Sequence, residues 1–117
     1  METTCENMKV EYKNVGHIWA EPPYVELTLY SRGKRILRYK LVFSKPWVSE
    51  NAVEHVIVSS EDEYNYASWG FTMKVKDLIE HVLEDIKGYT YKLRSPKLVI
   101  RFNNETGHII DYIKKKL

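Results

Sequence analysis

A run of basic residues beside a tyrosine is the clearest candidate chemistry in this sequence. Between Arg32 and Lys45 the chain carries six Lys or Arg residues and no Asp or Glu. Charged side chains of this kind can follow a phosphate backbone, and an aromatic ring beside them can stack on a base. The candidate nucleic-acid-binding residues are Tyr30, Arg32, Lys34, Arg35, Arg38 and Lys40.

The same residues have a second explanation, which is a solvated sheet face with Lys and Arg lying along apolar strand neighbours. The net charge of +2 is too small to indicate nucleic acid by itself. The charge is unevenly distributed, because residues 50–63 carry five acidic residues and neither Lys nor Arg. Opposed blocks of charge suit self-association or a partner with complementary patches. The alternative hypothesis is therefore a protein-interaction or regulatory module that acts as a homodimer.

Motifs for catalysis or metal binding are much weaker than the basic run. Asp77, His81 and Asp85 recur at every fourth position of an expected helix, but such spacing more often gives surface pairing than a metal site. Cys5 is the only cysteine, and no two histidines have zinc spacing. There is no Gly-rich phosphate loop and no nucleophile motif. We expect no metal and no cofactor, and a small enzyme with an unrecognised site is the third hypothesis, behind a non-enzymatic role.

The basic run needs an element that holds its side chains on one face, and a β-hairpin provides it. Residues 24–30 and 35–43 both alternate apolar with polar, which is typical of half-buried strands. Ser31 opposite Arg35 keeps the two faces separate, whereas a slip by one residue would mix them. This register predicts Leu29–Leu37, Leu27–Tyr39 and Val25–Leu41 pairs on one face, and Glu26–Lys40, Thr28–Arg38 and Tyr30–Ile36 pairs on the other. The turn type stays open, because Gly33 is not at the last loop position.

Three further segments are typical of strands. Residues 9–19 predict a first strand, with Gly16 as a possible bulge. The β-branched residues of 53–59 predict another, followed by a turn at residues 60–63. Residues 64–71 alternate again and predict its neighbour.

The C-terminal segment predicts a second hairpin. Residues 98–102 alternate, and Gly107 is the third residue of a loop after Asn104, where a left-handed conformation is needed. Asn104 opposite His108 then pairs Phe102 with Ile110 across the two arms.

Residues 73–87 predict an amphipathic helix. The apolar residues at 3,4 spacing are Val75, Leu78, Ile79, Val82, Leu83 and Ile86. Thr72 is the expected N-cap, and Gly88 is expected just beyond the end of the helix. A wide apolar stripe predicts that this helix covers a sheet, and each large residue contributes roughly 1.5–3 kcal/mol by burial.

The whole chain is expected to be a single domain, residues 1–117, with residues 1–8 disordered. The predicted fold class is α+β, with a mostly antiparallel sheet of about five to seven strands and one amphipathic helix packed on one face. A sheet of this kind has edges to protect, so we expect a homo-oligomer.

Composition also sets expectations about context. There is no apolar run of bilayer length and no secretory signal, so we expect a cytoplasmic protein with no membrane partner. A single cysteine fits a reducing compartment. The chain lacks Gln and is rich in Lys and Glu, which favours a thermophilic source.

Overall fold

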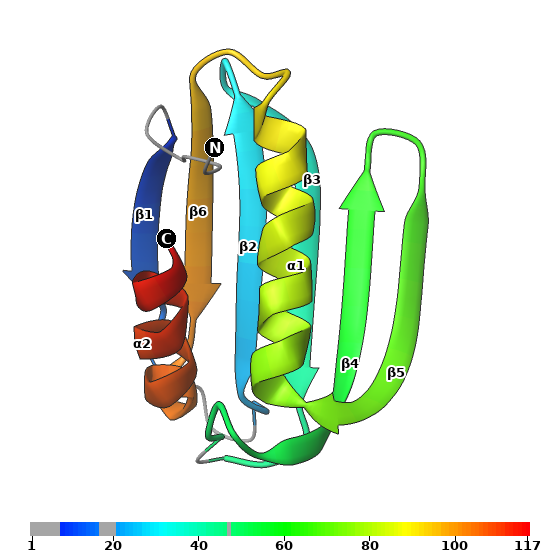
Figure 1. Cartoon of the computed structure of the whole chain (residues 1–117), viewed down its shortest axis with the longest axis vertical. Coiled ribbons are helices and arrows are strands. Elements are labelled where there is room, and N and C mark those ends of the chain that lie inside the picture. Colours follow the sequence, from blue (N-terminus) through cyan, green and yellow to red (C-terminus); the bar gives the residue numbers. More distant parts are fainter. Residues whose placement is uncertain (1–7, 17–20, 47) are drawn as a thin grey trace.

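A computed structural model describes residues 8–16, 21–46 and 48–117, and these form a six-stranded sheet with two α-helices (Figure 1). The elements are, in chain order, β1 (Lys9–Asn14), β2 (Tyr24–Ser31), β3 (Lys34–Phe43), β4 (Val53–Asp62), β5 (Tyr66–Lys74), α1 (Val75–Thr90), β6 (Pro96–Phe102) and α2 (Gly107–Lys116), with a 3₁₀ turn at Asn104–Thr106. The strand order is β1-β6-β2-β3-β4-β5. Only the β1–β6 pair is parallel among these neighbours, so the α+β fold with a mostly antiparallel sheet is confirmed.

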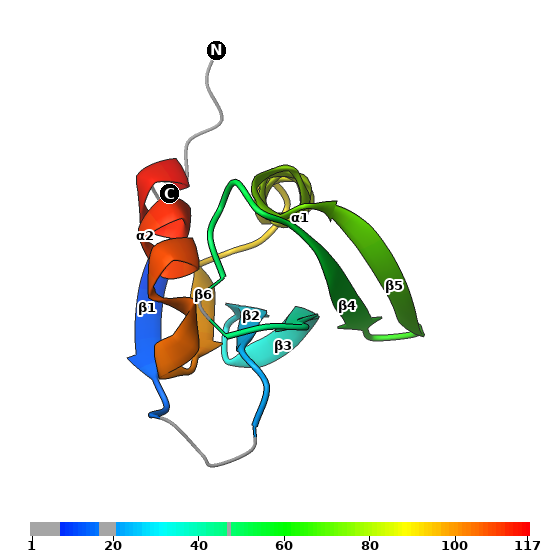
Figure 2. The same cartoon turned by 90° about the horizontal axis from the view of Figure 1, so that it is seen from below.

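Both helices lie on the same side of the sheet, as Figure 2 shows. α1 lies over the middle of the sheet, and α2 lies over the end formed by β1 and β6 (Figure 1). Neither helix covers the opposite side, which we call the outer face. In the described part of the chain, neither helix combines the length and apolar character that crossing a bilayer requires.

The core fills the space between the helices and the inner face of the sheet. All six apolar residues predicted on the helix stripe are buried, at 4% exposure or less. They pack against alternate strand residues, of which Val25, Leu27, Leu29, Leu41, Phe43, Leu98 and Ile100 are almost completely buried. Met8 also belongs to this core, whereas residues 1–7 of the segment expected to be disordered lie outside the described residues.

The β2–β3 hairpin has the predicted register along most of its length. Five of the six predicted cross-strand pairs are present, and the predicted Tyr30–Ile36 pair is wrong. Tyr30 faces Arg35 instead, because the register shifts after Leu29 and leaves Ile36 as the extra residue of a bulge. The turn is a two-residue loop, in which Arg32 (φ 53°) and Gly33 (φ 79°) are both left-handed. That conformation matches the right-handed twist of the flanking strands.

Helix α1 starts and ends later than its sequence pattern predicts. Thr72 is not the N-cap, because it lies inside β5. The first free N–H groups of the helix instead donate to the segment before β4: Val75 N–H to the Ala52 carbonyl at 2.9 Å and Lys76 N–H to the Glu50 carbonyl at 2.8 Å. Long-range backbone contacts thus satisfy the donors that a local cap would otherwise satisfy. Gly88 lies inside the helix rather than beyond it.

The predicted second hairpin is wrong, because its second arm is helix α2. Ile109, Ile110, Tyr112 and Ile113 are all buried, which a helix achieves and an alternating strand does not. Both neighbours of β6 are already present, since it pairs with β1 on one side and β2 on the other. A returning strand would find no edge of β6 to pair with.

Other boundaries shift by a few residues. Strand β4 continues to Asp62, so the predicted turn at residues 60–63 begins too early. Gly16 (φ 83°) follows the end of β1 and is not a bulge within it, and residues 17–19 of that predicted strand lie outside the described residues.

Candidate nucleic-acid interface

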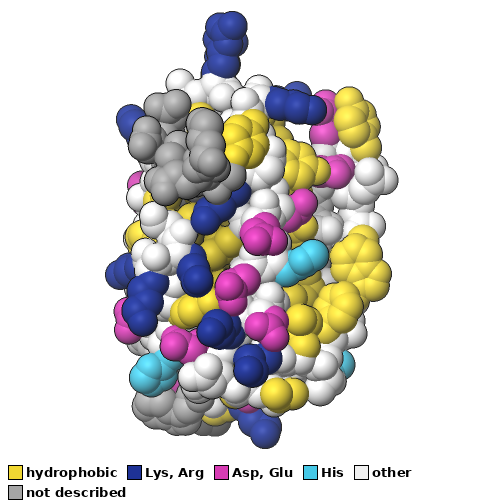
Figure 3. Space-filling view, viewed as in Figure 1, with side chains coloured by type: hydrophobic (Ala, Val, Ile, Leu, Met, Phe, Trp, Pro, Cys, Tyr) yellow, Lys and Arg dark blue, Asp and Glu magenta, His cyan; other side chains and the backbone are white. Residues whose placement is uncertain are grey.

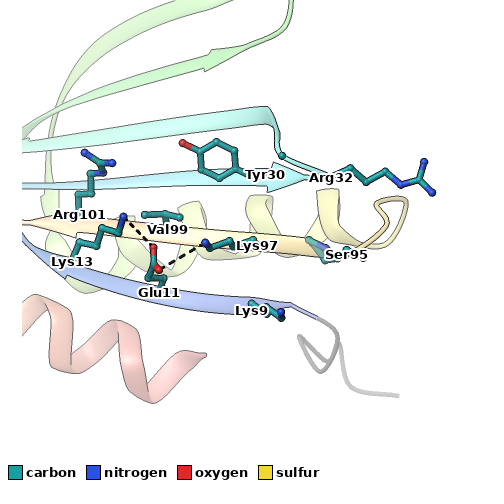
Figure 4. A pocket seen from close by; sticks show the side chains of 11 residues that line it. Lys9, Glu11, Lys13, Tyr30, Arg32, Ser95, Lys97, Val99 and Arg101 are labelled. Carbon is teal, nitrogen blue, oxygen red and sulfur yellow. Dashed lines mark ion pairs between the residues drawn. The ribbon is translucent and has the colours of Figure 1, made fainter.

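The outer face is hollowed at the end formed by β1, β6 and β2. Strand alternation turns Lys9, Glu11 and Lys13 of β1 and three residues of β6 to this side. A shallow basin of about 590 Å³ lies over them, which we call the basic basin (Figure 4). Its lining residues are Lys9, Glu11, Lys13, Tyr30, Arg32, Gly33, Ser95, Pro96, Lys97, Val99 and Arg101.

Among the described residues, the basic basin holds five Lys or Arg side chains and a single carboxylate. Glu11 lies in the middle, with its carboxylate 3.3 Å from the Lys13 ammonium and 3.8 Å from the Lys97 ammonium. Its single charge is therefore shared between two cations. Within the described part of the chain, Lys9, Arg32 and Arg101 form no ion pair. The basin keeps a positive excess that a bound anion can neutralise.

Parallel pairing of β1 with β6 brings these charges together. Lys13 lies beside Arg101, and Lys9 lies beside Lys97, which in turn is the partner of Tyr30 on β2. Two rows of cations therefore cross the strands, and the Glu11 row separates them. Figure 4 shows Arg32 reaching out beyond the ends of the strands.

The structure divides the six predicted site residues into groups. Tyr30 and Arg32 line the basic basin. The other four residues belong to β3 and lie outside the basin; they are Lys34, Arg35, Arg38 and Lys40. Lys34 contacts Glu63, with 3.4 Å between the ammonium and the carboxylate. Lys40 lies over the Tyr24 ring, 5.0 Å from its centroid.

Arg35 and Arg38 share one carboxylate on β4. Arg35 lies 2.7 Å from one oxygen of Glu61, and Arg38 lies 2.8 Å from the other. The hydrogen bond from Arg35 and the positive charges of both arginines hold the pKa of Glu61 below its ordinary value, against a smaller effect of burial. The acidic block of residues 50–63 thus neutralises Lys34, Arg35 and Arg38 of the basic hairpin within the same chain, because β4 pairs with β3.

The candidate binding residues predicted from the sequence do not include Lys9, Lys13, Lys97 and Arg101. The only local signal is their alternation, since the two cations of each strand lie four residues apart. Their meeting depends on the pairing of the first strand with the last. No local pattern indicates that pairing.

The acidic and histidine residues of α1 do not form a metal site in the described residues, where no group of three His, Cys, Asp or Glu side chains converges. Asp85 accepts a hydrogen bond from the Tyr39 hydroxyl instead. His81 lies on the wall of an apolar groove between α1 and β5.

Comparison with known proteins gives no relative from which a function could be carried over. No family model matches the sequence, and neither a curated protein nor a solved structure is significantly similar to it.

Proposed function

We propose that this protein binds single-stranded nucleic acid on the outer face of its sheet, with the basic basin as the contact surface. The observation that carries the proposal is the excess of five cations over one carboxylate among the described residues of one hollow, on a face that neither α1 nor α2 covers (Figure 2). Phosphate contacts supply most of the affinity of proteins for nucleic acid, and Lys and Arg are the side chains that make them.

The arrangement of the cations favours a polymer over a single small anion. The Lys13–Arg101 row and the Lys9–Lys97 row are four residues apart along the strands. At about 3.3 Å per residue, this separation is roughly 13 Å. One phosphate cannot contact both rows, whereas a chain of phosphates that crosses the basin can contact both.

Tyr30 favours an unpaired strand over a duplex. Its side chain is partly exposed and lies beside Lys97 within the basin. A base that is not already stacked in a helix can lie on this ring, and such a contact contributes roughly 1–3 kcal/mol. Tyr30→Ala should therefore weaken binding of single strands more than binding of duplexes.

The decisive experiment compares two double variants that each remove two positive charges. Lys9→Ala/Arg101→Ala removes from the basin two cations that form no ion pair within the described residues. Arg35→Ala/Arg38→Ala removes the two cations that Glu61 already neutralises. Fluorescence anisotropy with a labelled single-stranded oligonucleotide at several salt concentrations measures both.

We expect the basin variant to weaken binding of every sequence and to flatten the salt dependence. Each lost phosphate contact lowers the slope of log K against log salt by about 0.7, so the loss of two lowers it by about 1.4. Arg35→Ala/Arg38→Ala should change the slope of log K against log salt much less, because Glu61 already neutralises these two arginines. Glu61→Gln, which leaves Arg35 and Arg38 without their carboxylate, should strengthen binding. Equal effects of the two double variants, or no binding of wild-type protein at low salt, would refute the proposal.

A further inference from the structure

Large apolar side chains are exposed mainly on the β4–β5 arm. Six of the nine large exposed apolar residues of the described chain lie between residues 53 and 71. They are Val53, Ile57, Tyr64, Tyr66, Trp69 and Phe71. Figure 3 shows hydrophobic side chains gathered along the edge of the molecule where β4 and β5 lie in Figure 1. Exposed apolar side chains that lie together often mark an interaction surface.

Trp69 and Phe71 lie on the inner face of β5, where α1 does not cover them. Their side chains are 51% and 40% exposed, and their ring centroids are 6.5 Å apart. They form one wall of an apolar groove of about 510 Å³, with α1 residues such as Leu78 and Val82 on the other side. The inner face of the sheet is thus covered over its centre and open at this edge.

Strand β5 is also an unprotected edge. It pairs with β4 on one side and with no strand on the other among the described residues. Its nine residues contain one charged residue, Lys74, and no proline. The opposite edge, β1, carries Lys9, Glu11 and Lys13. Charged residues and prolines are the usual protection against edge-to-edge pairing, and β5 has very little of it.

The hydrogen bonds at the two ends of the β4–β5 ladder show which residues of β5 face the free edge. Val75 N–H donates to the Ala52 carbonyl, and Asp62 N–H donates to the Asn65 carbonyl. Both pairs continue the β4–β5 register. Hydrogen-bonded pairs alternate along an antiparallel ladder, so the odd-numbered residues of β5 bond to β4. The N–H and C=O groups that point to the free edge therefore belong to Tyr66, Ser68, Gly70, Thr72 and Lys74.

We infer that β5 pairs antiparallel with β5 of a second copy of this chain, about a two-fold axis at Gly70, to give a continuous twelve-stranded sheet. This register uses all nine residues of the strand. Gly70 faces Gly70 of the second copy, and both direct their backbone groups to the shared edge, as a hydrogen-bonded pair requires.

The same register places complementary side chains opposite each other. Trp69 faces Phe71 of the second copy in a non-hydrogen-bonded pair, where side chains are closest. The two-fold axis repeats this pair, so four aromatic rings, two from each copy, cover each other. Lys74 faces Tyr66 of the second copy, which allows a cation–π contact and brings no like charges together. This complementarity of charge and apolar surface favours a second copy over a different partner.

The first test compares two variants that each replace an exposed aromatic residue with lysine. Trp69→Lys places a charge at the centre of the inferred interface. Tyr91→Lys makes the same change in net charge at a 66% exposed residue outside the arm. Light scattering coupled to size-exclusion chromatography measures the mass at several concentrations. We expect wild-type protein and Tyr91→Lys at twice the chain mass of 13.9 kDa, and Trp69→Lys near a single chain mass.

The second test examines the register. In a Cys5→Ser background, the double variant Ser68→Cys/Thr72→Cys places two thiols opposite each other across the axis. Cα atoms in a hydrogen-bonded pair lie about 5.5 Å apart, which suits a disulfide. The two positions within one chain are roughly 13 Å apart and cannot be joined. Mild oxidation should give a covalent dimer, whereas each single-cysteine variant should stay uncrosslinked.

Three results would overturn the inference. One is wild-type protein of single-chain mass at high micromolar concentration. Another is a Trp69→Lys protein that stays dimeric, because a different surface would then hold the copies together. The third is crosslinking through Ser68→Cys alone, which requires an axis at residue 68 and a different register.

Discussion

At the scale of single residues, carboxylates decide which cations of the outer face can bind a ligand. Glu61 lies between Arg35 and Arg38 and occupies both guanidinium groups. Glu11 likewise lies between two cations, Lys13 and Lys97, but the basic basin holds three further cations. Surface ion pairs contribute little to stability, so the main effect of these carboxylates is on the charge presented to a ligand.

Tyr39 shows how one hydroxyl connects the sheet to α1. Its ring lines the apolar groove, and its hydroxyl donates a hydrogen bond to Asp85 on the helix. Burial, and next the hydrogen bond to the Asp85 carboxylate, raise the pKa of Tyr39 above its ordinary value. The neutral phenol is therefore favoured in the folded state. Because the unfolded chain ionises at about pH 10 and the folded chain does not, this contribution to stability is complete below that pH and is lost as the pH rises further.

Tyr39→Phe should lower the free energy of unfolding at pH 7 by about 1 kcal/mol, the typical net contribution of one hydrogen bond. It should also make the loss of stability above about pH 10 shallower than in wild-type protein, because one tyrosine with a raised pKa is gone. Urea unfolding at pH 7 and above pH 10 measures both effects. Tyr64→Phe is the matched control. Tyr64 is 84% exposed, so its substitution should lower the free energy of unfolding at pH 7 much less. An equal loss at pH 7 in both variants would contradict the role given to Asp85.

At the scale of elements, the C-terminal segment shows how tertiary context selects between strand and helix. The predicted hairpin and helix α2 both bury Ile110 and Tyr112. They differ at Ile109 and Ile113, which the hairpin would turn to the opposite face and the helix buries completely. Three lysines follow at the end of α2, where positive charge is favourable at a helix C-terminus.

Ile113→Ala should destabilise the protein by about 3 kcal/mol, since it leaves a cavity at a fully buried position. Lys115→Ala, an exposed change on the same helix, should stay within about 0.5 kcal/mol of wild type. Thermal or urea unfolding followed by circular dichroism measures both. If Ile113→Ala is as mild as Lys115→Ala, the segment does not pack on the sheet through this face.

At the scale of the whole molecule, the two proposed surfaces lie at opposite ends of one sheet. The basic basin involves β1, β6 and β2, and the inferred pairing edge is β5. A continuous sheet keeps the outer faces of both copies on the same side. With nine strand spacings of about 4.8 Å from β6 to β6 of the second copy, the two basins would be on the order of 40 Å apart in a flat sheet.

Such a dimer should bind a long single strand more tightly than a short one. An oligonucleotide that reaches both basins gains from effective concentration, which we expect to raise affinity by at least about tenfold. Trp69→Lys should remove this gain and leave affinity for a short oligonucleotide nearly unchanged, with Tyr91→Lys as the control for added charge. Anisotropy titrations with oligonucleotides of several lengths measure the difference. A length dependence that persists in Trp69→Lys would mean that the two surfaces do not act together.

The sequence alone determined the elements whose periodicity is strong. Alternation between residues 24 and 43 predicted the hairpin and most of its register, because a slip by one residue would expose the apolar face. The apolar stripe from Val75 to Ile86 predicted which face of α1 is buried, because 3,4 spacing puts these side chains on one side. Both patterns are local, because each can be recognised from the residues of one helix or of one pair of adjacent strands.

Only the tertiary structure decided which charges meet. No acidic residue lies near Arg35 and Arg38 in the sequence. Glu61 forms ion pairs with both because β4 pairs with β3. Lys9 and Arg101, near the two ends of the chain, share a basin because β1 pairs with β6. Likewise, the donors at the start of α1 bond to residues before β4, so no local cap marks the boundary. These contacts join residues far apart in the chain, and side-chain periodicity carries no information about which strands become neighbours.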